Sequence, residues 1–417
     1  MLSPPPALLH ADFRRLWTSM LFSGLAMQMA QVAIGWQVYS IRHNAFDLGL
    51  IGLAEFVPVP LLALPAGHLA DRLPRVGVVI VTSLGDAVVA ALLLVVTLHG
   101  AHELWQFVAL AALTGMIGAL GSPAGRSLTP ELVPADLLTG ALALRSIAGQ
   151  VATIGGPALG GFLFAVRPEA VYAASGGMLV LSALVLLPVT RPQAAPREAG
   201  EHAGVHTLFA GVRFIRATPV MLGAITLDLF AVLFGGAVAL LPLFAKSVLH
   251  TGPFGLGVLR SMVAVGALVA GIRLARRPLG GRAGRTLLLV VGTFGVSMVV
   301  FGLSRWFWLS AIALAVSGFA DMFSMNIRST TVALATPNRL LGRVNAVENV
   351  FIGASNELGA FESGAAAALL GAVPAVVAGG ALTIGLALVW PRLFPALAAV
   401  DRLDRLRPAA DRVPMEA

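Results

Sequence analysis

Two long apolar runs are joined by the charged stretch Gly67-His68-Leu69-Ala70-Asp71-Arg72-Leu73-Pro74-Arg75. A partial copy follows 204 positions later as Gly271-Ile272-Arg273-Leu274-Ala275-Arg276-Arg277-Pro278. Gly67, Arg72 and Pro74 have counterparts in the copy, whereas Asp71 corresponds to an alanine. Internal repeats of this kind are typical of membrane machines that alternate between two states. The stretch therefore predicts two related halves, of which the first alone keeps the acid in this loop.

The composition predicts an all-α integral membrane protein. The 417 residues are 58% hydrophobic and 12% charged, whereas a soluble domain is about 25% charged. The apolar runs have about 18–25 residues, the length of helix that crosses a hydrocarbon core of about 30 Å. Because the chain has no cysteine, disulfides, thiolate nucleophiles and sulfur-ligated metals are excluded.

Twelve membrane helices are predicted from these runs, six in each half. Their approximate limits are 16–40, 46–70, 77–98, 103–123, 137–165, 170–190, 219–243, 253–274, 285–303, 306–327, 343–371 and 374–394. Residues 1–11 lack the basic start and apolar core of a signal peptide, so we expect the first helix to stay in the membrane.

The basic residues predict the orientation of the helices. The 28 basic residues are arginines apart from Lys246, and 21 of them fall in one set of alternate loops against four in the other set. Cytoplasmic loops carry the excess of Arg and Lys, so both termini are expected in the cytoplasm. The net charge of +8 is thereby explained by a membrane, and no nucleic-acid partner is expected.

The polar interval between the two halves marks the predicted domains. We expect an N-terminal six-helix bundle at 1–190, a cytoplasmic linker with an amphipathic helix at 191–218, a C-terminal bundle at 219–395 and a cytoplasmic tail at 396–417. A second match supports the duplication, because Pro134, Leu137 and Leu138 align with Pro337, Leu340 and Leu341 at an offset of 203.

These motifs resemble those of the major facilitator superfamily. Gly67 to Arg75 resembles its signature between helices 2 and 3, with Pro74 in place of the usual glycine. The stretch Gly156-Pro157-Ala158-Leu159-Gly160-Gly161 looks like the motif of the exporting, antiporter branch, although Ala152 departs from that pattern. The stretches from Thr207 to Pro219 and from Leu340 to Asn345 resemble the enterobactin-exporter-like branch.

The resemblance implies a major facilitator fold and a set of gating residues. In that family the loop acid latches the cytoplasmic gate against the N-terminus of helix 11, where a carboxylate gains about 0.3–1 kcal/mol. Asp71 and Arg72 are the hypothesised latch here; a positive-inside turn is the alternative. The gating set implied by the two motifs is Gly67, Asp71, Arg72, Arg75, Gly156, Pro157, Gly160 and Gly161.

Ionisable residues inside a membrane are costly, which makes them candidates for proton coupling or for lining a cavity. Asp228 is flanked by bulky apolar residues in helix 7, and Arg145 is the counterpart by repeat of Glu348. Helix 11 also carries a polar stripe that lines a cavity or forms a buried seam. The candidates are Glu55, Asp86, Arg145, Asp228, Asp321, Asn345, Glu348, Asn349 and Asn356.

Three functions remain open at this stage. The first is a proton-coupled exporter of a small amphipathic compound, siderophore-like or drug-like, that works by alternating access as a monomer in the inner membrane. The second is an importer or uniporter of a metabolite. The third, a membrane enzyme, is disfavoured because no His, Cys or acid cluster suits acid–base work. No cofactor or metal is expected, and no phosphate-binding GxxxxGK motif for ATP is present.

Overall fold

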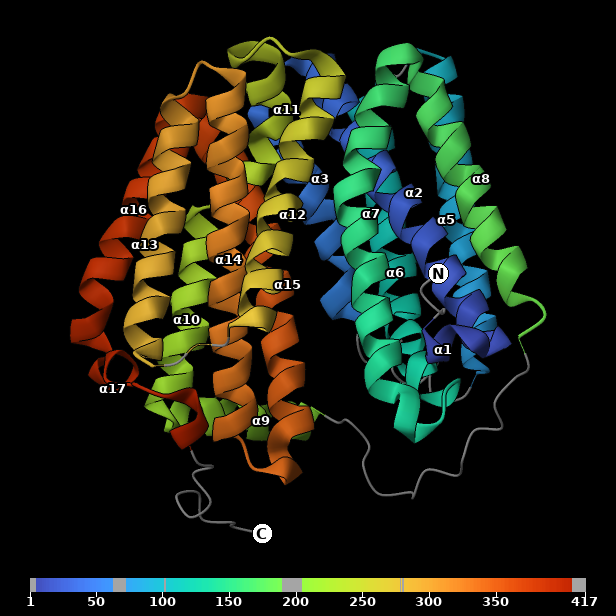
Figure 1. Ribbon diagram of the computed structural model, residues 1–417. Helices are drawn as coiled ribbons and strands as arrows, with labels where there is room; N and C mark the ends of the chain where they lie inside the picture. The colour runs from blue at the N-terminus through green and yellow to red at the C-terminus, as the bar shows by residue number, and fades with distance from the viewer. Residues whose placement is uncertain are drawn as a thin grey trace. The chain divides into compact units, whose positions relative to one another are not determined.

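The computed structural model of the protein describes residues 5–62, 73–100, 103–189, 205–277, 279 and 281–406. All regular elements within these ranges are helices, which confirms the predicted all-α class (Figure 1). The chain forms two compact units: unit 1 is Met1–Glu201 with Pro242–Ser261, and unit 2 is His202–Leu241 with Met262–Ala417.

The first half of the chain supplies eight labelled elements. They are α1 (Pro6–Leu9), α2 (Ala11–Arg42), α3 (Ala45–Phe56), α5 (Arg75–Leu98), α6 (Leu104–Glu131), η1 (Ala135–Leu137), α7 (Leu138–Val166) and α8 (Pro168–Leu186).

The second half begins with the short helix α9 and ends with short turns after α16. Its elements are α9 (Val205–Ala217), α10 (Pro219–Phe234), η2 (Ala237–Leu240), α11 (Leu241–Leu243), the π-helical turn η3 (Phe244–Val248), α12 (Gly252–Arg276), α13 (Ala283–Leu303), α14 (Phe307–Ala335), α15 (Asn338–Leu370), α16 (Ala372–Leu393), α17 (Pro395–Ala398) and η4 (Leu403–Arg405).

Twelve helical segments of the described chain are long enough to cross a membrane, as predicted. Ten of them are also apolar enough, counting 45–62 and the broken segment 219–248 as one span each. The remaining two, α2 and α15, have 32 and 33 residues and carry more polar side chains. Polar positions are thus concentrated in the first helix of one half and the fifth helix of the other.

The same helix pairs pack together in both units. In unit 1, α2 packs against α7 and α8, and α5 packs against α6 and α8. In unit 2, α10 packs against α15 and α16, and α13 packs against α14 and α16. In each half the first spanning helix therefore contacts the fifth and sixth, and the third contacts the fourth and sixth. Two pseudo-symmetric bundles follow from the duplication.

Glycines permit the closest of these contacts. A Cβ atom at Gly160 of α7 would lie 2.8 Å from Cα of Met29 in α2. At the corresponding place in unit 2, a Cβ atom at Gly359 of α15 would lie 2.9 Å from the carbonyl oxygen of Val232 in α10. Small residues allow membrane helices to approach at backbone distance, so both units depend on them.

Several helices differ from their predicted limits, and the predicted helix 103–123, for example, runs on to Glu131 as α6. The predicted helix 219–243 is broken after Phe234, because α10 ends at Gly235 and a 3₁₀ turn follows Gly236. The predicted helix 306–327 instead runs on to Ala335. It ends where Thr336 takes an extended conformation (ψ 128°) before Pro337, since a residue that precedes proline disfavours the helical region.

Residues 242–261 come from the second half of the sequence but pack in unit 1. The Lys246 ammonium donates to Oγ of Ser40 at 2.7 Å. Oγ of Ser261 donates to the carbonyl of Ile154 at 2.6 Å, and Nη2 of Arg260 donates to Oε1 of Gln31 at 2.7 Å. The compact unit therefore includes a segment beyond the six helices of the first half.

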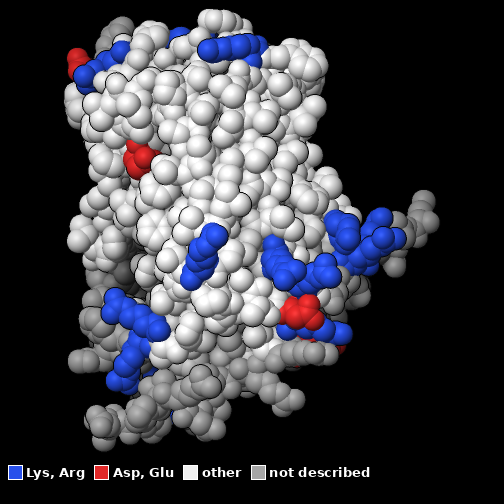
Figure 2. Space-filling view, turned by 90° about the vertical axis from the view of Figure 1, so that its left-hand side faces the viewer, with Lys and Arg blue, Asp and Glu red and all other residues white. Residues whose placement is uncertain are grey.

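The outer surface of unit 2 suits a lipid environment. Figure 2 shows the face that carries α16, where charged side chains gather toward the ends and a broad, mostly uncharged surface lies between them. Large apolar side chains are exposed there, with Leu289 of α13 at 71% and Leu388 of α16 at 68%. Such exposure would be unfavourable in water and is favourable against hydrocarbon chains.

Candidate functional site

A buried arginine binds two acids inside unit 2. Arg328 of α14 is 4% exposed, and Asp228 of α10 and Glu348 of α15 are 8% exposed each. Nε of Arg328 donates to Oε1 of Glu348 at 3.2 Å, and Nη1 forms an ion pair with Oδ2 of Asp228. We call these three residues the unit 2 triad.

The triad has an unbalanced charge. One guanidinium and two carboxylates carry a net charge of −1 when all three groups are ionised. Buried charges are strongly unfavourable unless they are compensated, and two carboxylates that share one site disfavour each other's ionised form. The triad therefore holds one buried negative charge that Arg328 does not compensate, which makes it a candidate site for proton coupling.

The helix α10 holds Asp228 against the core of unit 2. Its neighbour Leu227 is completely buried. Ala224 and Ala231, about one turn before and after Asp228, are buried in the same cluster. Ile327, which precedes Arg328 in α14, belongs to that cluster too. Packing on both neighbours therefore fixes the acid and the arginine toward each other.

Arg145 has a different set of partners in unit 1. Its Nη1 donates to the carbonyls of Gly125 (3.3 Å) and Arg126 (3.2 Å) and to Oγ1 of Thr129 (3.3 Å), all in α6. Pro130 has no N–H for the carbonyl of Arg126, so the guanidinium satisfies an oxygen that the helix leaves free. Arg145 and its counterpart by the repeat, Glu348, therefore each have partners within their own unit.

Two acids of unit 1 are close enough to influence each other. Glu55 of α3 acts electrostatically on Asp86 of α5, and Arg260 acts on Glu55. Oδ1 of Asp86 is buried with no hydrogen-bond partner among the described residues. A Cβ atom at Gly115 of α6 would collide with the carbonyl of Glu55, so α3 and α6 are in backbone contact here.

The charged loop is described only at its end. Gly67, Asp71 and Arg72 lie outside the described residues. Arg75 is the first residue of α5 and forms an ion pair with Glu131, the last residue of α6. The arginine of the motif thus connects the third and fourth spanning helices at their shared end.

The glycine motif of α7 contacts two neighbours within unit 1. A Cβ atom at Gly156 would lie 2.5 Å from Cβ of Gln28 in α2, and one at Gly161 would lie 2.5 Å from the carbonyl of Pro253 in α12. Gly160 also faces α2, and the carbonyl of Pro157 faces Gly257 of α12. The motif therefore brings α7 to backbone distance from both helices.

The polar stripe expected on helix 11 is split in the structure. Asn345 and Asn356 are exposed, whereas Glu348 is buried in the triad, and the side chain of Asn349 is not among those described. The polar face is therefore not one continuous surface, because an arginine from α14 covers its acid. Asp321 of α14 is exposed.

Sequence reasoning placed Arg328 at a helix end and so missed its role. The predicted helix 306–327 stopped one residue before Arg328, whereas α14 continues to Ala335 and Oγ1 of Thr331 donates back to the carbonyl of Ile327 at 2.7 Å. The repeat carried a usable signal, because Arg328 falls 202 positions after Arg126 and so corresponds to a position inside α6.

Unit 2 also contains a cavity of ligand size. It measures about 760 Å³, within the range of about 300–1,000 Å³ that is usual for small-molecule sites. Leu274, Met322 and Leu334 supply apolar walls, and Asn326 and Thr330 of α14 supply polar groups. The ion pair of Arg402 and Asp404 also lines the cavity. The cavity is thus suited to an amphipathic molecule.

Comparison with known proteins identifies the family. Residues 3–414 match the family described as transmembrane secretion effector, MFS_3. The chain belongs to this family. It is therefore a transporter of the major facilitator superfamily, as the motifs indicated, and a multi-pass membrane protein.

Named relatives lie in the enterobactin-exporter-like branch of the superfamily. The chain is 26% identical over 415 residues to the enterobactin exporter EntS of Citrobacter koseri, covering 97% of this chain and 96% of that protein. It is 26% identical over 408 residues to EntS of Shigella boydii serotype 18, covering 96% and 95% of the two chains.

Solved structures support the fold. A bacterial homologue of the lysosomal transporter Spinster superposes with a TM-score of 0.71 at 14% identity, covering 95% of this chain and 97% of that one. The nucleoside transporter NupG gives 0.66 at 14% identity, covering 93% and 99%. A bacterial homologue of the iron transporter ferroportin gives 0.66 at 18% identity, covering 94% and 99%.

Proposed function

We propose that this transporter exports a small amphipathic compound, of siderophore or drug-like character, in exchange for protons. The observation that carries the proposal is the unit 2 triad. A buried group with net charge −1 becomes neutral when it takes up one proton, and it links three helices of one bundle. A change of charge at such a place alters the packing of α10, α14 and α15 together, which is how protonation couples to a change of state.

Three observations favour export of such a compound. The named relatives are enterobactin exporters, and the glycine motif of α7 resembles that of the exporting branch. The 760 Å³ cavity in unit 2, with apolar walls, two polar side chains from α14 and the ion pair of Arg402 and Asp404, is consistent with amphipathic cargo.

The proposal includes an arrangement in the membrane. Both termini lie in the cytoplasm, and the functional parts are a bundle at 1–190, a linker at 191–218, a bundle at 219–395 and a tail at 396–417. The loop from Gly67 to Arg75, with Asp71 and Arg72, closes the cytoplasmic gate. The protein works as a monomer in contact with lipid.

Proton movement across liposomes tests the proposal. Purified protein is placed in liposomes with a pH-sensitive dye inside and an imposed proton gradient, and siderophores and amphipathic drugs are added in turn. We expect one class of compound to trigger proton movement. The variant Asp228→Asn should abolish it, whereas Asp136→Asn, at an exposed position of η1, should keep it.

The same assay separates the alternatives. Flux of a compound without proton movement would contradict antiport and favour a uniporter. Proton movement that survives in Asp228→Asn but is lost in Asp86→Asn would transfer the coupling role to Glu55 and Asp86 in unit 1. Loss in both variants would indicate that the two acid groups act in one cycle.

A further inference from the structure

The first spanning helix of unit 2, α10, is broken next to an acid. The last α-helical bond of α10 runs from the N–H of Gly235 to the carbonyl of Ala231 (2.9 Å). The chain then turns through Gly236 into η2, where the N–H of Ala237 donates to the carbonyl of Gly235 at 2.7 Å. Carbonyl groups in the last turn of a helix have no partner within that helix.

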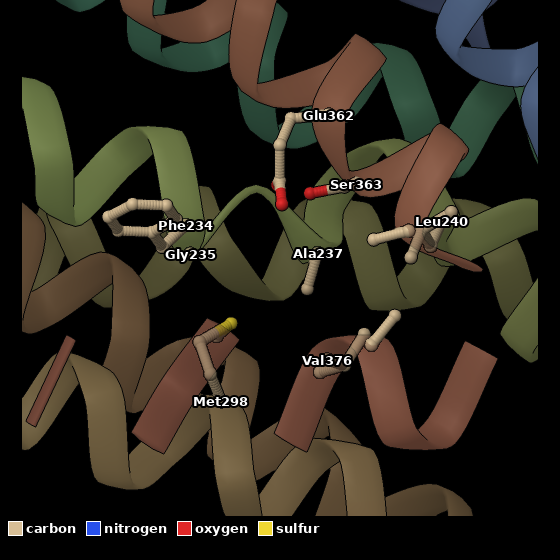
Figure 3. A pocket seen from close by; sticks show the side chains of 10 residues that line it. Phe234, Gly235, Ala237, Leu240, Met298, Glu362, Ser363 and Val376 are labelled. Atoms are coloured by element: carbon tan, nitrogen blue, oxygen red, sulfur yellow. The ribbon is translucent and has the colours of Figure 1, made fainter. Parts of the chain in front are cut away.

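Glu362 of α15 lies beside this break. Together with Ser363 it lines a small cavity that Phe234, Gly235 and Ala237 also line. Figure 3 shows the carboxylate of Glu362 and the hydroxyl of Ser363 side by side and directed toward the broken backbone.

The electrostatics of this place favour a positive charge. The C-terminal end of an α-helix carries about half a negative charge, and α10 directs that end toward the cavity. Glu362 adds a full negative charge, and the described residues that line the cavity include no Lys or Arg. Broken membrane helices commonly bind coupling ions through their unwound carbonyls and C-terminal ends.

The space limits the size and charge of an occupant. The cavity measures about 10 Å³, which is close to the room that one water molecule needs. A bare proton requires no such space, and a divalent ion would require more than one carboxylate to balance it. A sodium ion without its water shell has the right charge and is smaller than a potassium ion.

We propose that Glu362, Ser363 and the C-terminal end of α10 at Phe234 form a binding site for one sodium ion. The site is distinct from the unit 2 triad, because Glu362 follows Glu348 by 14 residues on α15, or about 21 Å of helix. Glycine is required at Gly236, since a Cβ atom there would lie 2.9 Å from Oγ of Ser363. Bound sodium joins α10 to α15 across the break.

Thermal unfolding in detergent tests the site with sodium chloride as the probe. A ligand that binds the folded state raises its stability in proportion to occupancy, so we expect the melting temperature to rise with sodium and then saturate. Potassium and choline chloride at matched ionic strength should give no such rise. Binding of radioactive sodium should approach about one ion per chain.

Variants separate this site from the triad and from poor folding. Glu362→Gln should lose the sodium response, and Ser363→Ala and Gly236→Ala, which keep the charge, should each need several-fold more sodium. The matched control Gly353→Ala in α15, with nothing within 4 Å, should respond as the wild type does. Asp228→Asn should keep the sodium response while it loses proton movement.

Three results would overturn the proposal. One is an equal response to sodium and potassium. Another is a sodium response that persists unchanged in Glu362→Gln. The third is a well-folded Ser363→Ala or Gly236→Ala protein with wild-type sodium affinity. None of these results bears on proton exchange at the triad, so the sodium site and the proposed antiport fail separately.

Discussion

The corresponding corners of the two units use arginine in different ways. In unit 1, Arg145 of the fifth spanning helix binds two backbone carbonyls and one hydroxyl of the fourth. In unit 2, Arg328 of the fourth spanning helix binds Glu348 of the fifth and Asp228 of the first. The repeat places Arg145 and Glu348 at equivalent positions, so these positions carry opposite charges and different partners in the two halves.

The partners of Arg145 are uncharged groups, whereas the partners of Arg328 are carboxylic acids. Carbonyl and hydroxyl partners do not change charge, so the joint of Arg145 is the same at every physiological pH. The partners of Arg328 are carboxylates, which balance its charge and leave one further negative charge. Under the proposed function, this difference between the two bundles is what would allow one of them to respond to protons.

Removing Arg328 should have the largest effect. The variant Arg328→Met leaves two buried carboxylates without their cation, and breaking a buried ion pair costs about 3–5 kcal/mol. We expect a large fall in the melting temperature and in the yield of folded protein. Adding Asp228→Asn and Glu348→Gln to the variant should restore much of the stability without restoring proton movement. If the triple variant moved protons, the triad would not be the titratable joint.

Removing Arg145 should cost less. Arg145→Met frees the carbonyls of Gly125 and Arg126, and hydrogen bonds to a charged group contribute about 1.5–3 kcal/mol. The melting temperature should fall, whereas the pH dependence of transport should stay that of the wild type. Thr129→Val, which removes one partner of the three, is the milder control. A changed pH profile in Arg145→Met would contradict the assignment of a purely structural joint.

The glycine contacts should behave alike in the two units. Gly156→Val in α7 and Gly359→Val in α15 force each helix away from its partner, and overpacking costs about 1–3 kcal/mol. The controls are Gly149→Val and Gly353→Val in the same helices, where a Cβ atom would meet nothing within 4 Å. Thermal unfolding of the four variants measures the effect. Equal losses in variants and controls would show that helix propensity, not close packing, is being measured.

The third spanning helices, α5 and α13, differ in how their N-termini are capped, and this difference should have the smallest effect on stability. Asp401 of the tail caps the N-terminus of α13. Its Oδ1 accepts a hydrogen bond from the N–H of Arg282 at 2.8 Å, and its carbonyl accepts one from the N–H of Ala283 at 2.8 Å. At α5 the cap residue is Pro74, whose side chain makes no capping bond.

Asp401→Ala should therefore cost about 1 kcal/mol, which is typical of a lost cap. Faster hydrogen exchange at the first amides of α13, with α5 unchanged, is the expected observation. Asp404→Ala is the control, because this acid forms an exposed ion pair with Arg402 instead. Unchanged exchange in Asp401→Ala would show that the backbone bonds alone hold the tail on α13.

Much of the fold could be read from the sequence. The lengths of the apolar runs predicted twelve spanning helices, since the thickness of a bilayer is fixed and a helix rises by a constant amount per residue. The offset between Gly67 and Gly271 predicted the duplication, which the paired helix contacts bear out. The acids of the candidate site, Asp228 and Glu348, were also visible, because charge inside an apolar run stands out.

Tertiary structure alone decided which of these residues act together. The partner of Asp228 is 100 positions further along the chain, and helical periodicity gives the face of a residue but not the helix that will cover it. Glu348 was predicted on a polar stripe that lines a cavity or forms a buried seam, and the structure buries it against Arg328 while Asn345 and Asn356 stay exposed. The break after Phe234 is a further case. A pair of glycines permits a helix to continue or to stop, and only its packing against Gly359 and Ser363 of α15 selects the broken form that meets Glu362.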